Sequence, residues 1–299
     1  MSSVRVEARP RDTPFADLGW NAGPLSFELV SSNPAVLDRA RVVFGPWLNG
    51  STGGGSRRVR FRVEADGGSG RQLWRVERNG NGEATVAESM DFALAAVEYA
   101  AIAELVAPDT GVVSLHAALL SRAGRGILLV GPKESGKSTL ACALLGAGWR
   151  IHSDDTAQIE DGPRARGIPR RVALRATSRE LLGAGTWDRI RDLPGTTSTR
   201  NGVLFHPSEF WLGKAPASVE PVAVFFLARR ASTVAPARLH RLDPGRALLA
   251  LAPYSNRCLA GIASALEALQ PLADRVPVFD LGRGDIATMI ERVEEAAAK

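Results

Sequence analysis

The sequence is poor in cysteine, in lysine and in long apolar runs, and each shortage excludes a class of protein. Its 299 residues contain two cysteines, Cys142 and Cys258. Two are too few for the disulfide framework that stabilises small secreted domains. Neither the cysteines nor the four histidines show metal-ligand spacing. The hydrophobic fraction of 45% is ordinary for a globular protein, so we expect a conventional core.

No apolar stretch is long enough to span a bilayer. The most apolar window, Phe92–Ala107, is interrupted by Glu98 and Glu104. It is shorter than the ~20 apolar residues of a spanning helix. The opening residues, MSSVRVEARPRD, lack the apolar segment of a signal peptide. We therefore expect a cytoplasmic protein with no membrane partner.

Only four lysines accompany 33 arginines, and the net charge is +5. The basic residues are scattered or paired, as at Arg170-Arg171, and aromatic residues do not interleave with them, which argues against nucleic-acid binding. Arginine evidently serves in this chain wherever a positive charge alone is needed. The presence of a lysine, Lys137, in a glycine-rich loop therefore suggests a position that needs a compact ammonium group. Lys133, at an unconstrained position of the same loop, weakens this inference.

The chain divides into two regions by pattern. Before about residue 108, short segments alternate apolar and polar residues, as half-buried antiparallel strands do. The strands expected there are Leu25–Val30, Val59–Val63, Gln72–Val76 and Ala84–Ala87, and the helices are Ala35–Phe44 and Met90–Val106. We predict a smaller N-terminal α+β domain over residues 1–108 and an α/β domain with a phosphate loop over residues 109–299.

The stretch Ile127–Leu145, ILLVGPKESGKSTLACALL, contains the most specific motif. An apolar strand, a glycine-rich turn and a helical pattern enclose G-x-x-x-x-G-K-[ST], the Walker A signature of a P-loop. Such a loop directs backbone N–H groups and a helix N-terminus at phosphate oxygens. Lys137 would reach the β- and γ-phosphates, and Ser138 would coordinate Mg²⁺. The candidate nucleotide-binding residues are Gly131, Pro132, Lys133, Glu134, Ser135, Gly136, Lys137, Ser138 and Thr139.

Two further strands flank this motif. Val112–Leu120 forms a hairpin with the phosphate-loop strand and carries His116 in its middle, where a core role is the commoner one. Trp149–Ser153 delivers Asp154 and Asp155 at its carboxyl end, where α/β folds bind ligands. One carboxylate can hold Mg²⁺ while the other accepts a proton from an attacking hydroxyl. The alternative is that the pair only caps the next turn.

The rest of the chain is less specific. Residues 161–215 are expected to be loop-rich and basic, with some arginines facing substrate, and Gly195–Asn201 to be a mobile loop near the site. The later elements expected are strands at Val219–Ala228 and Val276–Leu281 and helices at Ala247–Ala252, Leu259–Leu272 and Asp285–Ala298.

The segment from His116 to Asp155 resembles the catalytic core of HPr kinase/phosphorylase. It is still more similar to the HPr kinase-related proteins found in bacterial peptide natural-product gene clusters. The shared order is a histidine in a strand, a hairpin, the phosphate loop, a helix ending in Gly-Trp, and a strand ending in Asp-Asp. The further segments that resemble those proteins are Pro169–Arg175, Thr199–Gly202, Val276–Leu281 and Gly284–Ile286.

The resemblance implies a fold related to phosphoenolpyruvate carboxykinase, with a P-loop on a mixed sheet, and phosphoryl transfer from Mg²⁺–ATP to a serine-type hydroxyl. It implies that Asp154 is the general base and that Asp155 is the second metal-side carboxylate beside Ser138, with the reverse assignment left open. His116 would support the base by hydrogen bonding. The arginines implied for substrate contact are Arg171, Arg175 and Arg200, the last on a loop that closes over substrate.

One difference from the HPr kinases restricts the choice of phosphoryl acceptor. HPr kinases carry a glutamate-arginine-glycine signature downstream of the aspartates, and the nearest segment here, Arg164–Ile168, has no glutamate. This difference argues against HPr itself as the acceptor and against a reverse phosphorylase activity.

The leading hypothesis is therefore a Mg²⁺–ATP-dependent serine kinase acting on a peptide or small protein. The alternatives are a small-molecule hydroxyl kinase, a non-catalytic nucleotide-binding partner protein, and an ATPase or GTPase switch. No base-reading motif separates ATP from GTP. The acceptor and the oligomeric state, including a homo-oligomer, also stay open.

Overall fold

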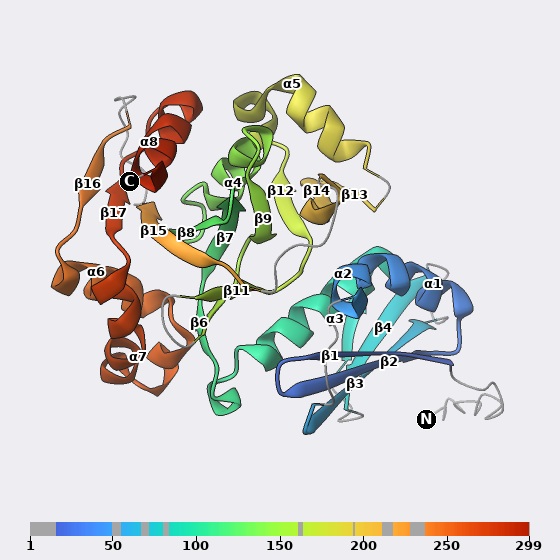
Figure 1. Cartoon of the computed structure of the whole chain (residues 1–299). Helices are drawn as coiled ribbons and strands as arrows, with labels where there is room; N and C mark the ends of the chain where they lie inside the picture. Colours follow the sequence, from blue (N-terminus) through green and yellow to red (C-terminus); the bar gives the residue numbers. More distant parts are fainter. Residues whose placement is uncertain are drawn as a thin grey trace, which may run out of the picture. The chain divides into compact units, whose positions relative to one another are not determined.

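The computed structural model describes residues 16–49, 55–66, 72–79, 84–160, 164–193, 195–210, 218–227 and 237–298. The chain forms two compact units, Met1–Ala101 and Ile102–Lys299 (Figure 1). Their division falls inside helix α3 (Met90–Leu105), ahead of the boundary expected at Pro108. Parts of the segment expected to be loop-rich, 161–163, 194 and 211–215, lie outside the described residues, as does Ala228.

The first unit is a five-stranded sheet in the order β1-β2-β3-β4-β5, in which only β2 and β3 pair in parallel. Its elements are β1 (Ala16–Ala22), β2 (Leu25–Ser31), α1 (Pro34–Val43), α2 (Gly45–Asn49), β3 (Arg57–Asp66), β4 (Leu73–Arg78), β5 (Ala84–Ala87) and the start of α3. The alternation predicted for β3 is confirmed, since Phe61 and Val63 are buried and Arg60 and Arg62 are exposed. Strand β1 was not predicted.

The second unit contains a six-stranded mixed sheet in the order β16-β17-β15-β8-β7-β9 and two three-stranded sheets, β11-β10-β6 and β12-β14-β13. Its strands are β6 (Val113–Leu115), β7 (Ala117–Arg122), β8 (Arg125–Val130), β9 (Arg150–Ser153), β10 (Ala157–Ile159), β11 (Ala165–Gly167), β12 (Val172–Arg175), β13 (Thr197–Thr199), β14 (Gly202–Phe205), β15 (Glu220–Leu227), β16 (Leu239–Arg241) and β17 (Val278–Leu281). The predicted α/β class with a mixed sheet is confirmed.

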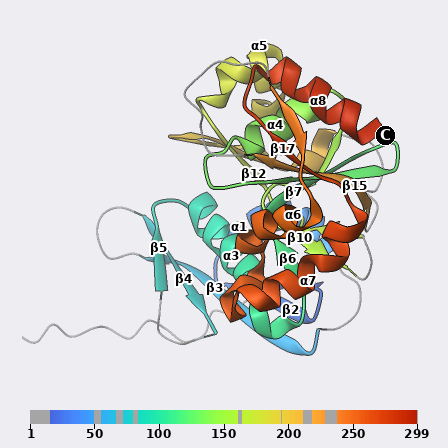
Figure 2. The same cartoon turned by 90° about the vertical axis from the view of Figure 1, so that its left-hand side faces the viewer.

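The helices of this unit cover both faces of the large sheet (Figure 2). The α-helices are α4 (Lys137–Gly146), α5 (Ser178–Arg191), α6 (Pro244–Leu251), α7 (Ile262–Arg275) and α8 (Ile286–Ala298), and the 3-10 helices are η1 (Pro108–Thr110), η2 (Pro207–Phe210), η3 (Ala252–Tyr254) and η4 (Asn256–Ala260). In β8, Ile127 and Leu129 share a core with α4, α5 and α8, whereas Leu128 and Val130 share one with α6 and α7. Burial on both faces explains the unbroken apolar run of this strand.

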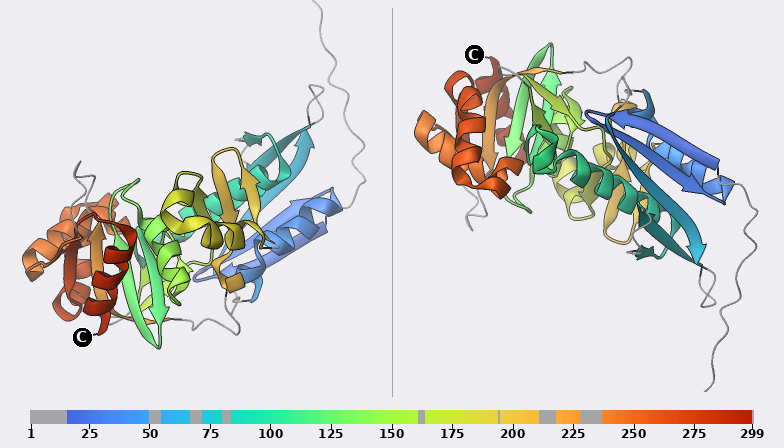
Figure 3. Two further views of the ribbon diagram at one scale, coloured as in Figure 1. Left: turned by 90° about the horizontal axis from the view of Figure 1, so that it is seen from above. Right: turned by 90° about the horizontal axis from the view of Figure 1, so that it is seen from below.

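The predicted hairpin before the phosphate loop is confirmed. β7 pairs antiparallel with β8, and β15 lies beside β8 in parallel (Figure 3). The predicted strand Val112–Leu120 is divided, however. It breaks at His116 into β6 and β7, which belong to different sheets.

The prediction of a loop-rich segment over 161–215 is wrong in the part that the structure describes. That part contains helix α5 and strands β11, β12, β13 and β14. The predicted mobile loop Gly195–Asn201 contains β13, which pairs with β14 over Thr197–Thr199. Helix α5 bends at Gly183, where φ is 74°. The bend interrupts the 3.6-residue period of apolar residues by which a helix is recognised in a sequence.

Among the helices that the structure describes, none has both the length and the apolar character needed to cross a membrane.

Candidate active site

The candidate catalytic residues gather at one edge of the six-stranded sheet. β8 and β9 both run antiparallel to β7, so the carboxyl ends of β8 and β9 meet the amino end of β7. The phosphate loop follows β8, Asp154 follows β9, and His116 precedes β7. β15 and β17 run parallel to β8, so the segment after β17 reaches the same edge. The topology thus brings together residues that are far apart in the chain.

His116 and the aspartates lie where the chain passes from one sheet to another. β6 pairs with β10, with Leu115 opposite Ala157, while β7 pairs with β9. The break at His116 therefore lies beside the break at Asp154–Thr156. The His116 N–H donates to the carbonyl oxygen of Tyr254 at 2.7 Å, which holds the backbone at the break.

Two glycines determine the backbone conformation of the phosphate loop, Gly131–Ser138. Gly131 and Gly136 have φ of 155° and 96°, and a Cβ built on Gly131 would collide with the carbonyl oxygen of Leu227. Glu134 has a left-handed φ of 69°, which is costly for a residue with a side chain. Helix α4 then begins at Lys137, with Gly136 as its N-cap. The strand–turn–helix context predicted for the motif is present.

We expect Gly131→Ala to lower the free energy of unfolding by roughly 2 kcal/mol or more, because the new Cβ must displace backbone. Gly124→Ala is the matched control, since Gly124 has φ of 82° but open space around a built Cβ. The control should lose only about 1 kcal/mol, from backbone strain. Denaturant unfolding measures both values. Equal losses would show that the steric explanation is wrong.

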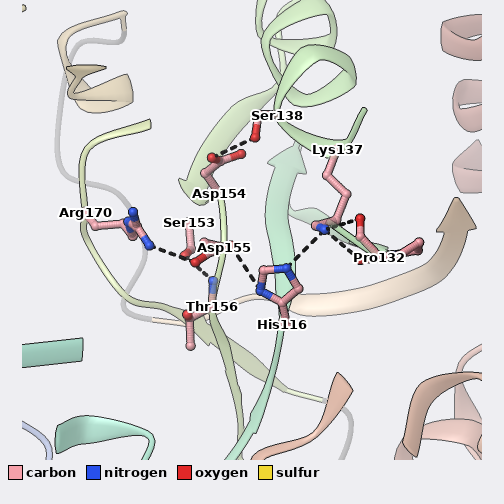
Figure 4. Close-up of polar contacts among 10 residues, drawn as sticks. His116, Pro132, Lys137, Ser138, Ser153, Asp154, Asp155, Thr156 and Arg170 are labelled. Carbon is pink, nitrogen blue, oxygen red and sulfur yellow. Dashed lines mark hydrogen bonds and ion pairs between the residues drawn. The ribbon is translucent and has the colours of Figure 1, made fainter. Parts of the chain in front are cut away.

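The side chain of Lys137, the first residue of α4, folds back into the preceding glycine-rich loop. It is 7% exposed, and its ammonium donates to the carbonyl oxygens of Gly131 at 2.7 Å and Pro132 at 3.3 Å (Figure 4). Burial lowers the pKa of Lys137, while the negative charges of Asp155 and Asp154 oppose that shift. The ammonium therefore supports the first half of the loop from within.

His116 connects this lysine to Asp155. Its Nε2 lies 3.2 Å from Lys137 Nζ, and its Nδ1 lies 3.0 Å from Asp155 Oδ1 (Figure 4). An ammonium can only donate, so a neutral imidazole with its proton on Nδ1 satisfies both contacts. Arg170 Nη1 donates to the other oxygen, Asp155 Oδ2, at 2.7 Å. The carboxylate of Asp155 is thus held at both oxygens.

The two aspartates have different environments. Burial acts to raise the pKa of Asp155, but the hydrogen bond from His116 and the charge of Arg170 outweigh it, so this pKa is lowered. Burial and the neighbouring charge of Asp155 raise the pKa of Asp154 to about 6, despite opposing contributions that include Arg170 and Ser138. Opposite shifts in adjacent carboxyl groups are typical of sites where the two have different tasks.

Asp154 and Ser138 fit a divalent cation. The Ser138 hydroxyl donates to Asp154 Oδ2 at 3.0 Å, and Asp154 Oδ1 is buried without a hydrogen-bond partner. Mg²⁺ prefers oxygen ligands and usually keeps water and phosphate oxygens among them. The described residues contain no group of three or more His, Cys, Asp or Glu placed to hold a metal ion. A cation here would therefore also need oxygens from water and phosphate.

The arginines that the resemblance implies for substrate contact occupy different positions. Arg175, at the end of β12, is exposed and donates to Glu134 Oε1 of the phosphate loop at 2.9 Å. Arg200 is exposed in the turn between β13 and β14. Arg171 is instead 1% exposed, and its Nη1 lies 3.4 Å from Thr197 Oγ1. It supports β13 from inside rather than lying exposed to a substrate.

Two other candidate nucleotide-binding residues, Thr139 and Lys133, have different surroundings. The Thr139 hydroxyl lies 2.8 Å from the Ser178 hydroxyl at the start of α5, so it joins two helices. Lys133 is exposed.

Sequence reasoning missed Arg170 and Arg283. Arg170 contacts Asp155, but it stands in a basic pair, and a sequence pattern does not show which member of a pair faces the aspartates. Arg283 Nη2 donates to the carbonyl oxygens of Ser135 at 3.1 Å and Glu134 at 3.3 Å. It follows β17, so the rule that parallel strands end at one edge could have identified it.

The site thus combines a glycine-rich loop between a strand and a helix with paired carboxylates after a nearby strand, the context in which the motif was predicted to bind phosphates. No protein-family model matches the chain, and no curated protein matches it. Among solved structures, it is similar to the HPr(Ser) kinase/phosphatase from Coxiella burnetii at 13% identity, over 62% of this chain and 88% of that chain, with a TM-score of 0.36. We therefore infer the function from the residues of the site.

Proposed function

We propose that the protein is a Mg²⁺–ATP-dependent kinase that transfers the γ-phosphoryl group to a serine-type hydroxyl on a peptide or small protein. The observation that supports this most is the meeting of a phosphate loop and two unlike aspartates at one sheet edge. Asp154 is buried beside Ser138, and Asp155 is held by His116 and Arg170. The acceptor class rests on the motif resemblance alone.

The phosphate loop and Lys137 would bind the nucleotide phosphates, and Ser138 and Asp154 would hold Mg²⁺. When bound, Mg²⁺ supplies charge compensation for the phosphate oxygens. The unpartnered Oδ1 of Asp154 and the raised pKa of this carboxyl group support a cation at this position. GTP in place of ATP fits the same residues, because none of them reads a base.

Asp155 is the better candidate for the proton acceptor, which reverses the first assignment drawn from the resemblance. Its side chain is 35% exposed, so it can meet an acceptor, whereas Asp154 is buried against Ser138. The acceptor oxygen would attack the γ-phosphorus, its proton would pass to Asp155, and ADP would leave. His116 and Arg170 would hold the carboxylate in place during this step.

The acceptor class can be tested with γ-phosphate-labelled ATP. The protein is incubated with a fractionated cell extract, and label is followed separately in peptides and proteins, in small molecules and in inorganic phosphate. The proposal predicts label on serine-type hydroxyls of the peptide or protein fraction. Label in small molecules would favour the small-molecule kinase, and label only in inorganic phosphate would favour a hydrolase. Nucleotide binding without any product would favour a partner protein.

We expect His116→Phe to lower the transfer rate about tenfold to a hundredfold and to weaken nucleotide binding by a smaller factor, because Lys137 Nζ also loses its contact with Nε2. The ring keeps its bulk but no longer orients Asp155. His240→Phe is the matched control, because His240 is exposed on β16. Steady-state kinetics with varied ATP separate kcat from KM. A loss no larger than that of the control would contradict the role of His116.

A further inference from the structure

Arg283 lies in a turn whose backbone has little freedom. The turn connects β17 with α8 at the edge of the sheet that bears the phosphate loop. The Gly282 N–H donates to the carbonyl oxygen of Arg238 at 2.8 Å. A Cβ built on Gly284 would collide with the backbone of Ala237. The glycines on either side of Arg283 thus pack closely against a neighbouring segment, and this fixes the origin of the arginine side chain.

The guanidinium of Arg283 contacts two consecutive carbonyl groups of the phosphate loop. Nη2 donates to Ser135 O at 3.1 Å and to Glu134 O at 3.3 Å. In a trans peptide unit the C=O and N–H groups point in opposite directions. A fixed Ser135 carbonyl therefore turns the N–H of Gly136 away from Arg283. The Glu134 carbonyl has the same effect on the N–H of Ser135, which donates to Pro132 O at 3.1 Å.

Two cations therefore divide the carbonyl groups of the loop between them. Lys137 holds those of Gly131 and Pro132, and Arg283 holds those of Glu134 and Ser135. A phosphate loop works when its carbonyls point outward and its N–H groups converge on the phosphates. Arg283 favours that orientation in the second half of the loop, whereas Lys137 binds its two carbonyl groups from inside the first half.

The second half of the loop needs such support. Glu134 has a left-handed φ of 69°, a conformation that persists only when the surroundings impose it. Its carbonyl accepts from Arg283, and its carboxylate accepts from Arg175 at 2.9 Å. The Arg175 contact is an exposed ion pair, which is worth little. The contacts of Arg283 to the backbone are the more direct restraint on the loop.

We infer that Arg283 is a positioning residue that keeps the ligand-free loop in its phosphate-binding shape. The inference rests on the proposed function, and it deepens that function by assigning the second half of the phosphate site to a residue outside the motif. The ligand class that depends on Arg283 is a chain of phosphates, either that of a nucleoside triphosphate or free pyrophosphate.

Calorimetric titration of the full chain with Mg²⁺–ATP and with Mg²⁺–pyrophosphate tests this inference. Arg283→Ala should weaken binding of both ligands about tenfold and by the same factor, because the loss lies in the phosphate cradle. Arg283→Lys should recover part of the affinity, since one ammonium replaces part of the contact. Arg292→Ala is the control, because Arg292 pairs only with Glu295 on α8 among the contacts described, and it should bind like the wild type.

The outcomes separate the inference from the proposed function. If the wild type binds neither ligand, both are wrong. If the wild type binds and Arg283→Ala binds equally well, only the inference is overturned. A merely structural role would lower the thermal midpoint without ligand, whereas the inference predicts midpoints like that of Arg292→Ala. If Arg283→Ala does not fold, Arg283→Met, which keeps bulk but has no donor, decides, and wild-type affinity in that variant overturns the inference.

Discussion

Replacing Lys137 with alanine should lower nucleotide-dependent turnover by at least about a hundredfold, the usual cost of removing a charge-stabilising donor from such a site. In the ligand-free protein its ammonium donates to Gly131 O at 2.7 Å and Pro132 O at 3.3 Å. Under the proposed function, the same ammonium reaches the β- and γ-phosphates. The variant would lose both the support of the loop and the positive charge. Initial rates with γ-labelled ATP measure the loss.

Lys133→Ala is the informative comparison for this prediction. Lys133 occupies the same loop and has the same charge, but it is exposed, whereas Lys137 is 7% exposed. A pure effect of net charge would reduce turnover equally in the two variants. We expect the loss in Lys133→Ala to be far smaller. Equal losses would contradict the special role of Lys137.

Asp154→Asn should make the protein more stable at neutral pH and at the same time stop phosphoryl transfer. Burial and the adjacent charge of Asp155 raise the pKa of Asp154 to about 6. A rise of roughly two units corresponds to about 3 kcal/mol of cost for the ionised form. Asparagine removes that charge, and its side-chain oxygen can still accept from Ser138. The gain should be on the order of 1–3 kcal/mol, because the amide also lies in a buried site.

The pH dependence of this gain has a definite sign. Between the unfolded value of 3.8 and the folded value of about 6, the folded protein binds more protons than the unfolded chain. The contribution of Asp154 to stability is therefore lost as the pH rises through this window. Asparagine does not titrate, so the advantage of Asp154→Asn should grow from pH 4 to pH 6 and level off above it. Thermal unfolding of both proteins over pH 4 to 8 measures this difference.

Asp155→Asn provides the matched control, with the opposite sign. The pKa of Asp155 is lowered, because the hydrogen bond from His116 and the charge of Arg170 together outweigh burial. Its charge is stabilised by the fold, so the asparagine variant should be less stable than the wild type at neutral pH. If Asp154→Asn were destabilising at every pH, the buried carboxylate would not carry the cost that we assign to it.

The sequence predicted the parts of the site that depend on local order. The phosphate loop could be recognised because eight consecutive positions, Gly131 to Ser138, determine it. Asp154 and Asp155 could be placed because ligands bind where strands of α/β sheets end. The nearness of His116 followed from the resemblance, and the structure places this residue 3.0 Å from Asp155.

Other features depend on pairings that a local pattern does not contain. The break at His116 was missed because apolar residues continue on both sides of it, although β6 and β7 pair in different sheets. The contact of Arg283 with the loop joins positions separated by 148 and 149 residues. The burial of Arg171 is a further example, since charge alone suggests exposure and the surrounding strands decide otherwise.

The most direct test of the proposed function is transfer of the γ-phosphoryl group to a hydroxyl, compared between the wild type and Asp155→Asn. Both proteins receive γ-labelled ATP, Mg²⁺ and the same cell extract, and nucleotide binding is measured in parallel. We predict that both bind nucleotide and that only the wild type places label on a serine-type hydroxyl. Label released by the wild type solely as inorganic phosphate would contradict the proposed function. Equal transfer by Asp155→Asn would contradict the assignment of Asp155 as the proton acceptor.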